Sequence, residues 1–169
     1  MKYILISIII LLTSCSNDTT NNTNGAISST SHLASEVGID ILKQGGNAFD
    51  AIVATGFTLA VTSPANGNIG GGGFLVAQTE SGEVFTLDFR EEAPADSYET
   101  MFLDENNEYS RELALFSHKS SGVPGTVDGL VKIFNDYGSG KFTLEEILAP
   151  AIDYAENGHK INKSSAFGF

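Results

Sequence analysis

The spacing of apolar positions along the first half of the chain predicts two consecutive helices. Apolar residues recur every three or four positions over 33–42, after Ser31 or Ser35 as a possible cap and before two glycines that can end a helix. The next segment, "AFDAIVATGFTLAVT" (48–62), is apolar or small on nearly every side, and Asn47 precedes it as a cap. We therefore expect an amphipathic helix followed by a helix that is buried on most sides.

Two runs of β-branched and aromatic residues then predict a β-hairpin. They are "FLVAQT" (74–79) and "VFTLDF" (84–89), and the short polar segment "ESGE" joins them. The following segment, 95–119, has no regular period, and Asn106 and Asn107 indicate a turn within it.

Two more helices are expected in the last third of the chain. Pro124 suits the first turn of one helix, which is amphipathic and ends at Gly138. Thr143 and Glu146 form a capping box at the start of the other, and Pro150 is expected to kink or divide it. Two helices, a hairpin and two helices indicate a layered α+β or α/β arrangement in which helices cover the sheet.

The N-terminal segment has the features of a bacterial lipoprotein signal. Residues 1–15, "MKYILISIIILLTSC", carry one positive charge and then an apolar run that is too short to span a bilayer as a helix. Leucine and two small residues precede Cys15, as in the lipobox whose cysteine receives lipid, although an ordinary signal peptide is the alternative. Residues 16–25 are polar and are expected to form a flexible tether. These features predict a lipid-anchored protein of the bacterial cell envelope, in the periplasm and on the outer membrane.

The length, hydrophobic content and net charge of the chain limit the kinds of molecule that it can bind. The chain has 169 residues, 41% of them hydrophobic, and a net charge of −12, so a folded domain is expected and nucleic acid is excluded as a partner. The last residues, "GHKINKSSAFGF", carry no clear helix-ending or strand-pairing signal. We therefore expect residues 26–169 to be the truncated N-terminal part of a longer protein.

Two candidate sites give weak signals. Gly70 to Gly73 precede a strand instead of opening a helix, and no lysine follows them, so we interpret them as sites of close backbone approach and not as a phosphate loop. His32, His118 and His159 are scattered without cysteine or carboxylate at metal-ligand spacing, and no metal site is predicted.

The charged residues after the second strand form a stronger candidate. The strand "VFTLDF" runs directly into Arg90, which is surrounded by Asp88, Glu91 and Glu92. From the residues alone, Arg90 is either an anion clamp or a solvated surface charge. The acidic residues are either a solvated cluster or a carboxylate pair for acid and base catalysis.

The order of five motifs resembles the start of the large subunit of the gamma-glutamyltransferases, also called gamma-glutamyltranspeptidases. These motifs are "ASEVGIDILKQGGNAFDAIVATGFTLAV", "NGNIGGGGF", "LDFREEAP", "SGVPGTVDGL" and "LAPAIDYAENG". The family belongs to the N-terminal nucleophile hydrolases. The resemblance therefore implies an α+β chain that forms part of a four-layer αββα sandwich, with the small-subunit portion as its missing partner.

The resemblance also implies a function. Members cleave the γ-glutamyl amide of glutathione and transfer the γ-glutamyl group to water, amino acids or peptides, with no cofactor. Their nucleophile is a threonine that self-cleavage exposes at the start of the small subunit. No threonine of this chain matches that motif, so no catalytic residue is assigned in this chain. The chain alone is therefore expected to be inactive. The arginine of the "DFRE-AP" motif, Arg90 here, binds the α-carboxylate of the donor.

Two alternatives to this function remain open at the level of sequence. One is a cephalosporin acylase, which removes glutaryl side chains on the same scaffold. The other is a lipid-anchored protein that binds γ-glutamyl compounds without catalysis.

Overall fold

The computed structural model describes residues 25–161, so the expected signal segment with Cys15 lies outside the described residues. Helices and one two-stranded antiparallel sheet make up this part of the chain, which confirms the α+β class. The elements, in chain order, are α2 (His32–Lys43), α3 (Ala48–Thr62), β1 (Phe74–Gln78), β2 (Val84–Asp88), α4 (Arg111–Phe116), the 3-10 helix η1 (His118–Ser120), α5 (Thr126–Tyr137) and α6 (Leu144–Asn157).

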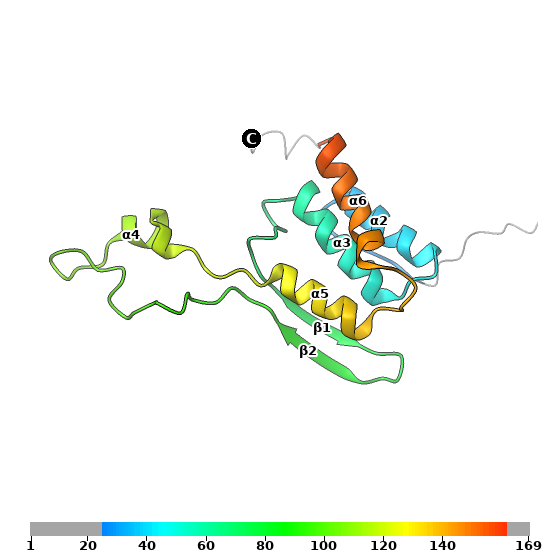
Figure 1. Ribbon diagram of the computed structural model, residues 1–169, viewed down its shortest axis with the longest axis horizontal. Coiled ribbons are helices and arrows are strands. Elements are labelled where there is room, and N and C mark those ends of the chain that lie inside the picture. The colour runs from blue at the N-terminus through cyan, green and yellow to red at the C-terminus, as the bar shows by residue number, and fades with distance from the viewer. Residues whose placement is uncertain (1–24, 162–169) are drawn as a thin grey trace, which may run out of the picture.

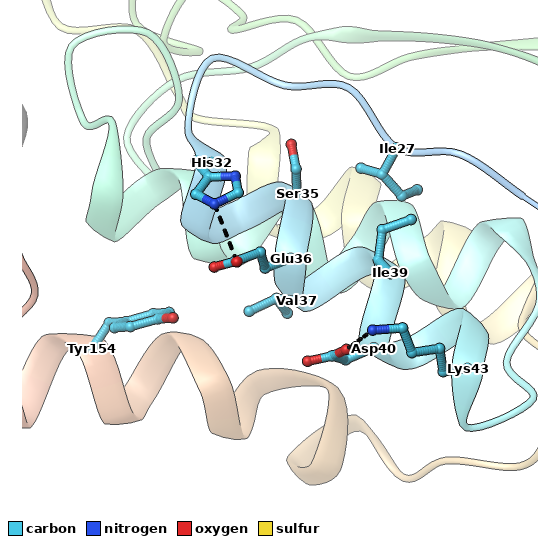
Figure 2. A pocket seen from close by; sticks show the side chains of 9 residues that line it. All are labelled: Ile27, His32, Ser35, Glu36, Val37, Ile39, Asp40, Lys43 and Tyr154. Atoms are coloured by element: carbon cyan, nitrogen blue, oxygen red, sulfur yellow. Dashed lines mark hydrogen bonds and ion pairs between the residues drawn. The ribbon is translucent and has the colours of Figure 1, made fainter. Parts of the chain in front are cut away.

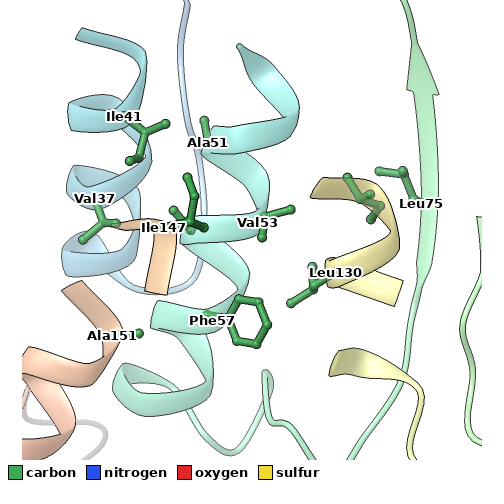
Figure 3. Close-up of a cluster of buried hydrophobic side chains, with 11 residues drawn as sticks. Val37, Ile41, Ala51, Val53, Phe57, Leu75, Leu130, Ile147 and Ala151 are labelled. Atoms are coloured by element: carbon green, nitrogen blue, oxygen red, sulfur yellow. The ribbon is translucent and has the colours of Figure 1, made fainter. Parts of the chain in front are cut away.

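Helix α3 is the centre of the fold, as its apolar composition predicts. Helices α2 and α6 pack against it, and α5 lies between it and the hairpin (Figure 1). Figure 3 shows Val53 and Phe57 of α3 in one buried cluster with side chains from α2, α5, α6 and β1. The two buried threonines of α3, Thr55 and Thr58, donate their hydroxyls to carbonyls one turn earlier, at 2.7 and 2.8 Å. Polar groups inside this helix are therefore satisfied within the helix itself.

A buried aspartate ties α3 to the connection between α5 and α6. Asn47 and Asp50 form the capping box of α3, in which Asp50 Oδ2 accepts the Asn47 N–H at 2.9 Å. The fully buried Asp50 carboxylate also accepts the Ser139 N–H, at 3.1 and 3.2 Å from its two oxygens. The charge lies at the favourable end of the helix dipole and has backbone donors from two segments.

We expect Asp50→Ala to lower the free energy of unfolding by about 2 kcal/mol, because buried N–H donors of two segments lose their acceptor. Asp50→Asn keeps one acceptor oxygen and is expected to cost less. Thermal unfolding of the protein, in the length that its cells make, measures both. Glu36→Ala, on the exposed side of α2, is the matched acidic control. Equal melting temperatures for Asp50→Ala and Glu36→Ala would contradict the assignment.

The hairpin has one covered face and one open face. Its strands pair antiparallel with Val76 opposite Thr86. Leu75 is buried against the helices, whereas Phe74, Val76 and Val84 on the other face are exposed. Residues 25–161 thus form one helical region on one sheet, with the second face of that sheet uncovered within this range.

One local prediction for the last helices is wrong, and another is wrong in part. Pro124 lies before α5, whose N-cap is Gly125, and not in its first turn. The reason is tertiary, because the N–H groups of Gly125 and Thr126 both bind the Gly71 carbonyl, at 2.9 and 3.0 Å. Helix α6 runs through Pro150 as one helix, so the expected division does not occur, and a kink there stays a prediction. Ile147 and Ala151, on either side of the proline, are buried.

Residues 93–122 form an arm that extends away from the helical body (Figure 1). Glu92 and Val123 close its base through two backbone hydrogen bonds of 3.1 and 2.8 Å. The predicted turn is confirmed, with Asn107 at a φ of 62°. Helix α4 was not predicted, since six residues are too few to show a period. Among the helices of residues 25–161, none is long and apolar enough to cross a membrane.

Candidate anion-binding site at the end of strand β2

Arg90 occupies a fixed position just beyond the end of β2. The strand pairing continues past its last residue, since Phe89 N–H donates to Gly73 O at 3.0 Å and Gly73 N–H donates to Phe89 O at 3.2 Å. The Arg90 N–H then donates to Asp88 Oδ1 at 2.9 Å. Because the backbone on both sides is hydrogen-bonded, the Arg90 Cα is held in place while 60% of its side chain stays exposed.

Glycines from two other segments pack against the same backbone. A Cβ added at Gly72 would lie 2.5 Å from Phe89 O and 2.8 Å from Arg90 C, and one at Gly125 would overlap Phe89 O. The Gly71 carbonyl accepts the first N–H groups of α5, so the glycine run also anchors that helix. The interpretation of the glycine run as a site of close backbone approach is confirmed at Gly72, whereas an added Cβ at Gly70 would meet only Asn68 Oδ1, at 3.4 Å.

The guanidinium of Arg90 has two neighbours. Its Nε lies 3.0 Å from Glu91 Oε2, and within residues 25–161 Glu91 is the one carboxylate at ion-pair distance from it. Its Cζ lies 5.8 Å from the centre of the Phe74 ring, which is within the range of a cation–π contact. An arginine held through Nε retains its two terminal nitrogens, which can form a two-pronged contact with a carboxylate.

A pocket of about 770 Å³ adjoins Arg90 between β2 and the start of α5. Its charged lining includes Asp128 and Lys132 from α5. Lys132 is engaged by Asp136 at 2.7 Å, and this hydrogen bond and charge raise the pKa of Lys132 above its usual value. Among the described residues, Glu91, the next residue in the chain, is therefore the one ion-pair partner of Arg90, whereas Lys132 is paired with Asp136.

The acidic neighbours have structural contacts. Asp88 binds the backbone of Arg90, and Glu91 binds its side chain. Glu92 pairs through its backbone with Val123 at the base of the arm. For Asp88 and Glu91, these side-chain contacts favour positioning roles over the acid and base pair that the sequence left open.

The three histidines lie apart. His32 pairs with Glu36 at 3.1 Å beside a separate hollow of about 570 Å³ on α2 (Figure 2). His118 belongs to η1, and His159 stands edge-on to Tyr154. In the described part of the chain, no three histidine, cysteine, aspartate or glutamate side chains gather as metal ligands.

The sequence analysis did not identify Phe74, which contacts Arg90, or Asp128 and Lys132 of α5, which line the pocket. Phe74 could have been found from the period of two, because in an antiparallel hairpin it lies on the same face as Asp88 and Arg90. The α5 residues had no comparable signal, since only the tertiary packing brings them to the strand end.

The chain is similar in sequence and in structure to proteins of one family and its relatives. The sequence profile of the gamma-glutamyltranspeptidase family matches residues 34–167. The glutathione hydrolase proenzymes of Pseudomonas aeruginosa and Escherichia coli are 47% and 43% identical over 81% and 84% of this chain. The crystal structure of the Helicobacter pylori gamma-glutamyltranspeptidase superposes with a TM-score of 0.81 at 45% identity and covers 85% of this chain and 41% of that one. A cephalosporin acylase of Bacillus halodurans superposes with a TM-score of 0.66 at 33% identity, over 80% of this chain and 24% of the acylase.

The fold and these neighbours define an α+β chain of the N-terminal nucleophile hydrolase class. Within that class, the chain belongs to the gamma-glutamyltranspeptidase family. It spans about a quarter of the length of the two curated relatives, 24% of each.

Proposed function

We propose that these residues serve a γ-glutamyl hydrolase and transferase, and that Arg90 binds the α-carboxylate of its γ-glutamyl donor. The observation that carries the proposal is the Arg90 guanidinium, fixed at a hydrogen-bonded strand end and exposed beside a pocket. A planar guanidinium matches a carboxylate with two parallel hydrogen bonds, and lysine offers only a point charge. Membership of the family supports glutathione and related γ-glutamyl compounds as donors.

Arg90 supports catalysis by binding the donor at its α-carboxylate, which lies at the opposite end of the γ-glutamyl group from the amide bond that is cleaved. An N-terminal threonine of a small subunit, outside this chain, attacks the γ-carbonyl, and its own α-amine accepts the hydroxyl proton. The amide nitrogen leaves with a proton, and water or an acceptor amine then releases the γ-glutamyl group from the threonine ester. Binding the carboxylate at the far end of the γ-glutamyl group fixes the carbonyl relative to the nucleophile, which lowers the entropic part of the barrier.

The open face of the hairpin supports a partner within the same protein. Val76 and Val84 expose apolar surface on a regular sheet face, and Phe74 lies at the end of that face beside Arg90. In an αββα sandwich, a second sheet packs against such a face at a separation of about 10 Å. We propose that the small-subunit portion supplies this sheet and the threonine.

Cephalosporin acylase activity is the second candidate, because an acylase superposes on the chain. A glutaryl group has the same length as a γ-glutamyl group and keeps its terminal carboxylate, but lacks the α-amino group. Arg90 therefore suits either donor, and recognition of the amine must separate the two activities.

The direct test uses the protein from native membranes, captured with an antibody to residues 26–160. We expect two chains, the smaller beginning with threonine, and hydrolysis of γ-glutamyl-p-nitroanilide at least tenfold faster than of the glutaryl anilide. Intact mass measurement also reports whether Cys15 carries lipid, as an envelope anchor requires. Preference for the glutaryl anilide would indicate an acylase. Glutathione binding by an uncleaved chain without hydrolysis would indicate a binding protein.

A further inference from the structure

The strand register places Phe74 beside the proposed clamp. Phe74 pairs with Asp88, and the next pair, Gly73 and Phe89, is also hydrogen-bonded in both directions. Continuing the register by one more residue sets Gly72 opposite Arg90. Since the residue opposite Arg90 has no side chain, the nearest side chain across the hairpin is the diagonal one, Phe74.

Phe74 has no core role within residues 25–161. It is 65% exposed, on the face of β1 that points away from the helices, while its neighbour Leu75 is buried. Its ring makes a cation–π contact with Arg90, whose Cζ lies 5.8 Å from the ring centre. The ring is therefore placed to act on the guanidinium rather than to fill the helical core.

Arg90 is thus held from two directions. Glu91 binds Nε at 3.0 Å, which fixes one edge of the guanidinium. The Phe74 ring faces it through a cation–π contact, which also restricts the rotation of a long side chain. A guanidinium that is ordered before the ligand arrives loses less conformational freedom on binding than a mobile one.

We propose that Phe74 is a positioning residue of the donor site, which orients Arg90 so that its terminal nitrogens receive the donor carboxylate. This inference rests on the proposed function of Arg90 and adds a residue to it. Because Phe74 acts through Arg90, its effect is confined to substrates that carry the carboxylate.

The test compares two substrates of the protein in the length that its cells make. One is γ-glutamyl-p-nitroanilide, and the other is 4-aminobutyryl-p-nitroanilide, which keeps the amine and lacks the carboxylate. Phe74→Leu is expected to raise KM for the first about threefold to tenfold with kcat nearly unchanged, and to leave the second unaffected. Phe74→Tyr keeps an aromatic face and is expected to behave like the natural protein.

A double-mutant cycle with Arg90→Ala separates this inference from the proposed function. In the Arg90→Ala background, Phe74→Leu is expected to have no further effect on the preference between the two substrates. If Arg90→Ala itself leaves that preference unchanged, both the clamp and the role of Phe74 are overturned. If Arg90→Ala abolishes the preference but Phe74→Leu does not alter it, only the inference about Phe74 fails.

A purely structural role for Phe74 would give a different pattern. It would lower the melting temperature and impair both substrates equally, and Phe74→Leu would then differ from Phe74→Tyr in stability alone. Phe74→Met provides a second variant without an aromatic face should the leucine variant not fold. The same loss in both apolar variants for the γ-glutamyl substrate alone is the result that the proposal requires.

Discussion

Arg90→Ala is expected to lower kcat/KM for γ-glutamyl-p-nitroanilide by about 10² to 10³. The carboxylate of the donor would lose two charge-assisted hydrogen bonds, which together contribute roughly 3 to 4 kcal/mol. The fold should persist, because the side chain is 60% exposed and its neighbours hold the backbone of Arg90 rather than depend on its charge. Steady-state kinetics together with a melting curve measure both effects.

The control for this prediction is the substrate without a carboxylate. For 4-aminobutyryl-p-nitroanilide, Arg90→Ala should change kcat/KM by less than about threefold, so the preference for the γ-glutamyl donor falls toward one. Arg90→Lys keeps the charge but not the two-pronged geometry, and an intermediate value is expected. A loss of equal size for both substrates would show that Arg90 supports the fold or the chemistry and does not bind the carboxylate.

The sequence predicted those parts of the fold that depend on local pattern. The helix over 48–62 was found with its asparagine cap and its burial, because nearly every one of its positions is apolar or small. The hairpin over 74–89 was predicted from its β-branched and aromatic residues. Its register pairs Gln78 with Val84, which leaves a short connection between the strands, as expected. Arg90 was found from its position after a strand and from the resemblance of its motif.

The errors occurred where distant segments decide the local structure. Pro124 looks like the first turn of a helix, yet α5 begins at Thr126 because the Gly71 carbonyl accepts the N–H groups there. Pro150 does not divide α6, whose residues Ile147 and Ala151 on either side of it are buried in the core. Neither contact is visible in a local window of sequence.

The glycine run connects these observations to the site. Gly71 binds the start of α5, and Gly72 lies against the backbone of Phe89 to Glu91. The same glycines therefore set both the helix that lines the pocket and the strand end that carries Arg90. A side chain introduced into this run should disturb the clamp without touching it directly.

Gly72→Ala is expected to lower the free energy of unfolding by about 3 kcal/mol. A Cβ there would lie 2.5 Å from Phe89 O, 2.7 Å from Glu91 N and 2.8 Å from Arg90 C. These are backbone atoms, so no side-chain rotation can relieve the overlap, and the strand end must move.

Because Arg90 moves with that backbone, Gly72→Ala is also expected to reduce kcat/KM for the γ-glutamyl substrate by at least about tenfold in the fraction that folds. Gly70→Ala is the matched control, since an added Cβ at Gly70 meets only Asn68 Oδ1, at 3.4 Å. Melting curves and kinetics of the two variants, measured side by side, check both effects. If Gly72→Ala were as stable and as active as Gly70→Ala, the close approach of the two backbones would not determine where Arg90 stands.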